Sequence, residues 1–189
     1  MNKLKAIFKE IDKLLAVKEL VLVAIDGKSG AGKSTLALQL SEAYACNILP
    51  LDHFFLPSWL RTVDRLREVG GNVDYQRFKE EVIAGLKRGG QFSYRPYDCQ
   101  VDQFGPEIVV QAKKLNIIEG VYSMHPILIA AYDLKIFMDI SAEEQEKRIL
   151  QRDGPCKLGR FLNEWIPLEN RYFREMKIAE QCDIIIDNF

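Results

Sequence analysis

Short, continuous apolar runs alternate along this chain with longer segments in which apolar residues recur at helical spacing. Unbroken apolar runs are typical of strands that are covered on both faces of a parallel sheet. Five of them predict strands: Val21–Ile25, Asn47–Leu51, Leu115–Ile118, Leu134–Met138 and Ile184–Ile186. Strands that alternate with helices predict right-handed crossovers, and so an α/β fold with a mainly parallel sheet between two helical layers. The length of 189 residues fits a single domain.

The intervening segments predict helices over residues 3–17, 33–45 and 75–88, and one that begins at Pro126. The helix over 75–88 has Asp74 in the capping position and ends at Gly89-Gly90. The spacing from Ser141 to Glu144 fits a capping box, followed by a charged helix that the sequence Asp153-Gly154-Pro155 breaks. A last helical region is interrupted or kinked at Pro167.

Residues 91–110 follow neither pattern. Phe92 and Tyr94 alternate with polar residues, prolines follow, and Ile108–Val110 is a second short apolar run. We expect an irregular ribbon or flap here rather than a core element.

The composition limits which partners, metal sites and cellular compartment we expect for this chain. The chain is 48% hydrophobic and 28% charged with a formal net charge of −1, so we expect neither nucleic acid nor a membrane as a partner. No apolar run approaches the roughly 18–20 residues of a membrane span. Four widely spaced cysteines and two histidines argue against structural zinc and favour free thiols in a reducing compartment, and hence a cytoplasmic protein.

Carboxylates stand at or beside the ends of all five predicted strands: Asp26, Asp52, Glu119, Asp139 and Asp187. The carboxyl ends of parallel strands lie along one edge of the sheet, where α/β proteins build their sites. For Asp139 and Asp187 we favour the simpler interpretation that strand ends are polar.

The segment Gly27–Thr35 decides the chemistry at that edge. Gly27-Lys-Ser-Gly-Ala-Gly-Lys-Ser matches the phosphate-binding loop pattern Gly-x-x-x-x-Gly-Lys-[Ser/Thr] and lies between a predicted strand and a predicted helix. Its backbone N–H groups can surround phosphates, Lys33 can reach the β- and γ-phosphates, and the Ser34 hydroxyl can bind Mg²⁺. We therefore expect ATP and Mg²⁺ as cofactors, and the nucleotide-binding residues Gly27, Ser29, Gly30, Ala31, Gly32, Lys33, Ser34 and Thr35.

The loop alone does not separate kinases from GTPases or motor ATPases. The chain has no Asn-Lys-x-Asp motif for reading guanine, and no strand that ends in aspartate before a catalytic glutamate. Instead one strand leads into Glu119-Gly120, and Asp52 closes the strand that follows the loop's helix.

With these residues the chain resembles the uridine kinase-like family of P-loop kinases, which includes nicotinamide riboside kinase, phosphoribulokinase and pantothenate kinase. The pieces that carry the resemblance are Asp26–Thr35, Leu51–Phe55, Asn72–Asp74, Tyr97-Asp98, Ile118–Tyr122 and Arg148–Arg160. The resemblance implies a kinase for a small hydroxylated metabolite.

The resemblance assigns Asp52 as the catalytic aspartate that receives the proton of the acceptor hydroxyl, and Glu119 as an acidic residue near Mg²⁺. Each has a structural alternative: Asp52 could be a magnesium-shell or strand-capping residue, and Glu119 a helix-capping or loop carboxylate. A carboxylate with a pKa near 4 does not ionise an alcohol. Asp52 would orient the hydroxyl and accept its proton late in a loose transition state.

Further substrate and lid residues follow from the same resemblance. Asp74 matches a residue that holds ribose hydroxyls, although an N-cap explains it equally well. Tyr97 and Asp98 belong to the substrate side, where an aromatic ring could stack on a base, or simply form one face of the ribbon. Arg148, Arg152 and Arg160 belong to a lid over about 148–162, in which Arg148 binds nucleotide and Arg152 acts in catalysis, unless they form a solvated helix face.

Two positions depart from the pyrimidine kinases of this family. No histidine follows Tyr97-Asp98, and His53 stands beside Asp52 where those enzymes have a small or acidic residue. The expected acceptor is uridine or cytidine, with nicotinamide riboside or another hydroxylated metabolite as the alternative. An ATP-binding regulatory or accessory protein without transfer is a further alternative, against which the intact Lys33, Ser34, Asp52 and Glu119 argue.

Overall fold

A computed structural model describes residues 3–187 and 189. Its five-stranded central sheet consists of β1 (Val21–Gly27), β2 (Cys46–Pro50), β7 (Leu115–Glu119), β8 (Leu134–Asp139) and β9 (Ile184–Asp187). The main helices are α1 (Lys3–Val17), α2 (Lys33–Ala43), α3 (Val63–Arg67), α4 (Tyr75–Arg77), α5 (Ala84–Arg88), α6 (Pro126–Ile129), α7 (Ala142–Arg160) and α8 (Ile166–Glu175). All five predicted strands are confirmed, within a residue or two at their ends.

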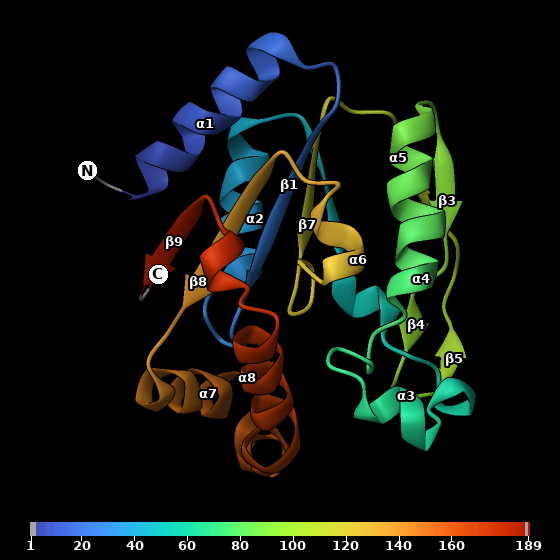
Figure 1. The fold of residues 1–189 in the computed structure, drawn as a ribbon, viewed down its shortest axis with the longest axis vertical. Helices are drawn as coiled ribbons and strands as arrows, with labels where there is room; N and C mark the ends of the chain where they lie inside the picture. Colours follow the sequence, from blue (N-terminus) through green and yellow to red (C-terminus); the bar gives the residue numbers. More distant parts are fainter. Residues whose placement is uncertain (1–2, 188) are drawn as a thin grey trace.

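The strand order is β2-β7-β1-β8-β9, and every neighbouring pair is parallel. Because these strands are parallel, the segments that follow β1, β2 and β7 all leave the sheet at the same edge (Figure 1). Pro50 pairs with Glu119, and Ile25 pairs with Glu119 from the other side. The register therefore brings the end of β2, the end of β7 and the beginning of the phosphate loop together.

Two apolar layers enclose the sheet. Alternate residues of β1, Val21, Val23 and Ile25, face α1 and α2 and pack with Ile7 and Leu40 among others. This burial of one stripe of each helix is what stabilises α1 and α2 on the sheet.

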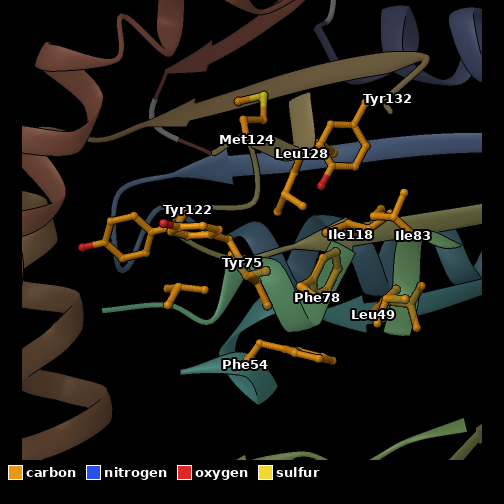
Figure 2. Close-up of a cluster of buried hydrophobic side chains, with 14 of the residues drawn as sticks. Leu49, Phe54, Tyr75, Phe78, Ile83, Ile118, Tyr122, Met124, Leu128 and Tyr132 are labelled. Carbon is orange, nitrogen blue, oxygen red and sulfur yellow. The ribbon is translucent and has the colours of Figure 1, made fainter. Parts of the chain in front are cut away.

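The other face of the sheet carries α4–α5, α6 and α8. Leu22 and Ala24 of β1 point to this side, together with Leu49 of β2 and Ile118 of β7. Figure 2 shows Phe54, Phe78 and Tyr122 among the side chains of this cluster. The two faces use alternate residues of the same strands, which explains why the strands read as continuous apolar runs.

The ribbon over residues 91–110 differs in part from the expectation. It forms two short antiparallel pairs, β3 (Phe92–Tyr94) with β6 (Ile108–Val110) and β4 (Tyr97–Asp98) with β5 (Gln103–Phe104). The expectation that it lies outside the core was wrong at Tyr94 and Val110, which are each 4% exposed and belong to the larger apolar cluster. The alternation of Phe92 and Tyr94 with polar residues is typical of a strand with one buried face, and the helical stretch from α4 to α5 covers that face.

One predicted strand end differs from the structure, whereas the predicted break of the charged helix at Asp153-Gly154-Pro155 is confirmed. Leu51 begins a 3-10 turn, η1 (Leu51–Phe54), rather than ending a strand, and this turn places Asp52 beyond the sheet edge. The helix α7 is bent at Gly154 (φ 79°, ψ 173°), after which it continues from Pro155 to Arg160. A π-helical turn, η4 (Phe161–Trp165), then joins α7 to α8, with Pro167 in the first turn of α8. No helix in the described part of the chain is long and apolar enough to cross a membrane.

Candidate active site

The phosphate loop has the backbone shape that its glycines allow. Gly27, Gly30 and Gly32 have positive φ angles of 140°, 80° and 95°. A Cβ atom at Gly27 would lie 2.1 Å from the carbonyl oxygen of Met138, so only glycine fits between β1 and β8 here. The helix α2 begins at Lys33 directly after Gly32, and its N-terminus faces the loop.

Lys33 lies folded over the inside of this loop. Its Nζ donates to the carbonyl oxygens of Gly27 at 2.8 Å and Lys28 at 3.0 Å, and the residue is 9% exposed. Its charge helps to hold down the pKa values of Asp52 and Glu119, which places all three within electrostatic reach of one another.

Ser34 and Glu119 form a pair of oxygen donors at the loop. The Ser34 hydroxyl donates to Glu119 Oε2 at 3.1 Å, and Glu119 is 8% exposed. Burial raises the pKa of Glu119, and the nearby charge of Asp52 raises it further. A hydroxyl beside a carboxylate is an oxygen donor set of the kind that Mg²⁺ prefers, so these residues fit the expected metal. In the described part of the chain no cluster of three or more His, Cys, Asp or Glu is arranged to hold a metal by protein ligands alone.

Asp52 lies next to the end of β7. A Cβ atom at Gly120 would lie 3.4 Å from Asp52 Oδ1, and φ of Gly120 is 140°. Asp52 is exposed at this edge of the sheet, and desolvation by the surrounding protein raises its pKa, while the charges of Lys33, His53 and Arg152 lower it. The structure thus brings together Lys33, Ser34, Asp52 and Glu119, as the sequence predicted.

Asp26 is fully buried beneath the loop and links three segments. Its carboxylate accepts from the backbone N–H groups of Gly27 at 2.7 Å, Tyr122 at 3.2 Å and Met124 at 2.9 Å. The Tyr172 hydroxyl of α8 also donates to it, at 2.8 Å. Burial nevertheless raises the pKa of Asp26 to about 6, against the effect of these hydrogen bonds. Asp26 therefore fixes the loop, the turn after β7 and α8 to one another.

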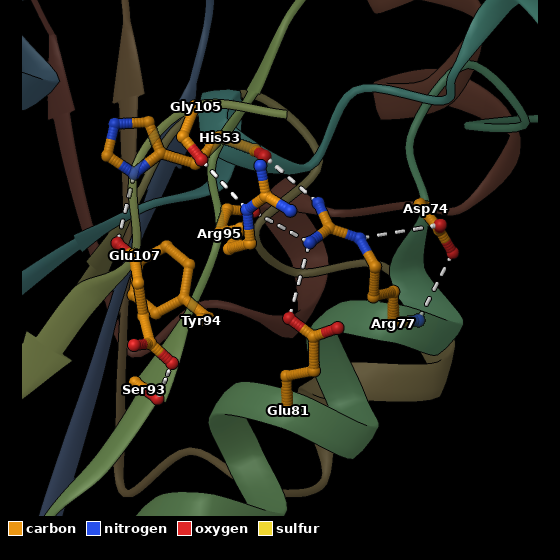
Figure 3. A network of polar contacts seen from close by, with 9 residues as sticks. All are labelled: His53, Asp74, Arg77, Glu81, Ser93, Tyr94, Arg95, Gly105 and Glu107. Carbon is orange, nitrogen blue, oxygen red and sulfur yellow. Dashed lines mark hydrogen bonds and ion pairs between the residues drawn. The ribbon is translucent and has the colours of Figure 1, made fainter. Parts of the chain in front are cut away.

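Asp74 and Arg77 connect Asp52's turn to the flap (Figure 3). Asp74 caps α4 by accepting from the Arg77 N–H at 3.1 Å, so the N-cap interpretation is confirmed. The Arg77 guanidinium donates to the carbonyl oxygens of His53 at 3.1 Å and Arg95 at 2.9 Å, and to Glu81 at 3.2 Å. It also lies 4.0 Å above the centre of the Phe54 ring. His53 in turn shares a 2.9 Å hydrogen bond between its Nδ1 and the Tyr94 hydroxyl.

Tyr97 and Asp98 form β4, which contacts the turn η1 that carries Asp52. Tyr97 is 4% exposed, its ring packs edge-on against Trp59 and Phe104, and its hydroxyl donates to Asp102. Asp98 is exposed and accepts from the Gln100 N–H at 2.7 Å within the turn. In this structure the Tyr97 ring is thus covered rather than presented to an acceptor.

The predicted lid arginines lie along α7 at increasing distance from the loop. Arg148 Nη1 donates to the Gly30 carbonyl oxygen at 3.3 Å, so this arginine touches the loop itself. Arg152, one turn later, is paired with Asp153 at 2.7 Å and lowers the pKa of Asp52 through its charge. Arg160 lies beyond the bend at Gly154, 3.4 Å from Glu164 and above the Trp165 ring.

The sequence of this chain is similar to those of known kinases. Residues 70–160 match the sequence profile of the Phosphoribulokinase / Uridine kinase family. A uridine kinase of Clostridium novyi (strain NT) is 28% identical over 144 residues, which cover 70% of this chain and 68% of that protein. The chain is thus similar to P-loop kinases of the phosphoribulokinase/uridine kinase family. In kinases of this kind ATP is the phosphoryl donor, typically with Mg²⁺.

Solved structures share the fold of this chain. A structure titled "Possible Uridine Kinase" from Bacillus stearothermophilus superimposes with a TM-score of 0.69 at 18% identity, covering 96% of this chain and all of that one. A D-glycerate 3-kinase from Cryptococcus neoformans var. grubii superimposes with a TM-score of 0.59 at 12% identity, covering 89% and 87% of the two chains. The predicted three-layer P-loop kinase fold is confirmed.

Sequence reasoning missed four residues that organise the site: Gln145, Glu169 and Tyr172 beside the loop, and Arg77 beside Asp52. Glu169 and Tyr172 are three apart, which predicts only that they share one face of α8. Nothing in the sequence indicates that this face meets the phosphate loop.

Proposed function

We propose that this kinase transfers the γ-phosphoryl group of ATP to a hydroxyl group of a small metabolite, most simply the 5'-hydroxyl of a nucleoside such as uridine or cytidine. The observation that carries the proposal is the position of Asp52. It lies beside Glu119 and Gly120 and within electrostatic reach of Lys33, on the acceptor side of the loop. A protein that only bound nucleotide would have no use for a carboxylate there.

Asp52 would hold the acceptor hydroxyl in line with the γ-phosphorus and take its proton as the new bond to oxygen forms. A pKa raised by the surrounding protein makes this carboxylate a somewhat better proton acceptor than an exposed aspartate. The phosphoryl transition state is loose, so positioning matters more than deprotonation in advance.

The remaining residues would bind and neutralise the phosphates. The loop N–H groups and Lys33 hold the triphosphate, and Ser34 and Glu119 hold Mg²⁺, which neutralises charge on the phosphate oxygens when bound. Arg148 would stay at the loop, and Arg152 would act on the transferred group from the part of α7 that precedes the bend at Gly154.

A second acceptor class is a smaller hydroxylated metabolite without a base. The covered ring of Tyr97 favours this class, because it is not available to stack on a base in this structure. Nicotinamide riboside carries a ribose and a six-membered aromatic ring, so it belongs with the nucleosides.

The test is ATP consumption by the purified protein over a panel of nucleosides, nicotinamide riboside, pantothenate and sugar phosphates. One acceptor should support turnover, and Asp52→Asn should lower kcat with that acceptor by at least about 10³-fold while ATP binding is kept. The reason is that asparagine keeps the shape but cannot accept the proton. Tight ATP binding with no turnover on any acceptor would favour the accessory protein, and full turnover by Asp52→Asn would remove Asp52 from the catalytic role.

A further inference from the structure

Ser29, in the first half of the phosphate loop, is held by side chains from two helices that lie far away in the sequence. Its N–H donates to Glu169 Oε2 at 3.0 Å and its hydroxyl donates to Glu169 Oε1 at 2.5 Å. Its carbonyl oxygen accepts from Gln145 Nε2 at 2.9 Å. Every polar group of this residue is therefore engaged by α7 or α8.

Both holding side chains are buried. Glu169 is 4% exposed and Gln145 is 3% exposed. Removing a carboxylate from water costs several kcal/mol unless hydrogen bonds compensate, and both bonds that Glu169 accepts come from Ser29. Burial raises the pKa of Glu169, while the Ser29 bonds and the charge of Lys33 lower it. A buried carboxylate with two bonds to one residue is a fixed contact and not a mobile surface group.

The helix α8, which carries Glu169, also contacts the beginning of the loop at a second point. Tyr172, one turn after Glu169, donates to Asp26 at 2.8 Å. Asp26 and Ser29 flank Gly27-Lys28, so α8 contacts both sides of the first turn of the loop. This makes α8 part of the nucleotide-binding scaffold, and leaves the bend at Gly154 as the point after which the lid can move.

We infer that Glu169 is a positioning residue for ATP: it fixes Ser29, with Gln145, so that the loop is already shaped for phosphate before nucleotide arrives. Without this contact the loop would have to be ordered when ATP binds, and that cost would appear as lost ATP affinity. The inference rests on the proposed binding of ATP by the loop, and it assigns Glu169 no contact with either substrate.

The experiment compares Glu169→Gln with Glu175→Gln. Both replace a carboxylate of α8 by its amide, but Glu175 is an outer residue paired with Arg171 at 3.0 Å. The Mg²⁺ complex of a non-hydrolysable ATP analogue is titrated into each full-length protein, and the KM values for ATP and acceptor are measured separately.

Glu169→Gln should raise the Kd of the analogue and the KM for ATP by roughly tenfold, because one charge-assisted hydrogen bond is lost. The KM for the acceptor should change by less than about twofold, and Glu175→Gln should match the wild type. A merely structural role would lower the active fraction, and with it kcat, while the KM for ATP stayed the same.

A second pair of variants keeps the test independent of folding yield. Ser29→Ala removes the hydroxyl that Glu169 accepts from, and should weaken analogue binding in the wild type but add little in the Glu169→Gln background. Fully additive effects would overturn the inference, as would unchanged affinity in Glu169→Gln. Tighter binding by Glu169→Gln would also overturn it, since the carboxylate would then compete with phosphate.

The two proposals fail in different ways. If the wild type binds the analogue but phosphorylates no acceptor, the proposed kinase function fails while the role of Glu169 can still be measured. If the wild type turns over an acceptor and Glu169→Gln binds ATP as well as the wild type, only the role of Glu169 fails.

Discussion

At the scale of single residues, the site depends on side chains that hold backbone rather than substrate. Arg77 shows this most clearly on the acceptor side. Its side chain is 14% exposed, and its planar fork reaches the carbonyl oxygens of His53 and Arg95 while it stacks on Phe54. Because His53 follows Asp52 directly, Arg77 helps to fix the position of the proposed catalytic carboxylate.

Arg77→Lys keeps the charge, but an ammonium group cannot make all of these contacts at once because it lacks the planar set of N–H donors of a guanidinium. We expect a loss of about 1–3 kcal/mol in the free energy of unfolding and a several-fold lower kcat, with ATP affinity unchanged. Urea unfolding and steady-state kinetics measure these effects. Arg88→Lys is the control, because Arg88 is exposed at the end of the same helical stretch. An Arg77→Lys variant with wild-type kcat would show that Arg77 has only a structural role.

At the scale of elements, α7 is the helix whose shape bears most directly on the proposed lid. Its first half touches the loop through Gln145 and Arg148, and its second half, after Gly154, carries Arg160 away from it. The angles of Gly154 (φ 79°, ψ 173°) lie in a region that is open essentially to glycine only. The bend is therefore built into the backbone.

Gly154→Ala should destabilise the fold by about 1–3 kcal/mol through backbone strain alone, because no atom lies within 4 Å of the position that its Cβ would take. It should also lower kcat if the bend is the hinge of the lid. Gly159→Ala is the matched control: it has the same open surroundings, but its φ is not positive. That variant should be neutral or up to about 1 kcal/mol more stable, as measured by thermal unfolding. Equal stability of the two variants would contradict a strained bend at Gly154.

At the scale of the whole molecule, two buried groups give stability opposite dependences on pH. Asp26 has its pKa raised from 3.8 to about 6 by burial, so the folded state binds its proton more tightly than the unfolded state. Asp26 therefore makes the free energy of unfolding fall as pH rises from about 4 to 6. His125 is buried against Tyr75, with ring centres 4.1 Å apart, and burial lowers its pKa from 6.5 to about 4. His125 therefore makes the free energy of unfolding fall as pH decreases from about 6.5 to 4.

Each of these contributions is worth about 3 kcal/mol, since one pKa unit between the folded and unfolded states corresponds to about 1.4 kcal/mol. They oppose each other over nearly the same pH range. Between pH 4 and 6.5, we expect the slope of the free energy of unfolding against pH to be more positive in Asp26→Asn than in the wild type. We expect the slope in His125→Gln to be more negative than in the wild type. Urea titrations at several pH values measure the slopes, whatever each variant does to overall stability. Parallel slopes in all three proteins would contradict both assignments.

Much of this molecule could be predicted from the sequence because the relevant signals are contiguous. The five strands, the helix over 3–17 and the loop Gly27–Thr35 each lie in one short segment whose pattern is sufficient. The meeting of Asp52 and Glu119 also followed, because parallel strands bring their carboxyl ends to one edge and the two strands are neighbours in the sheet.

Only the tertiary structure decided what holds that site in place. Ser29 meets Glu169 across 140 residues of sequence, and Asp26 meets Tyr172 across 146. The periodicity of α8 indicates which residues share a face, but the surface which that face meets depends on the path of the whole chain. The sequence by itself determined a phosphate loop and the carboxylates Asp52 and Glu119 at one sheet edge. Its support by α7 and α8 was decided by packing, because hydrogen bonds between distant segments leave no periodic signal in either one.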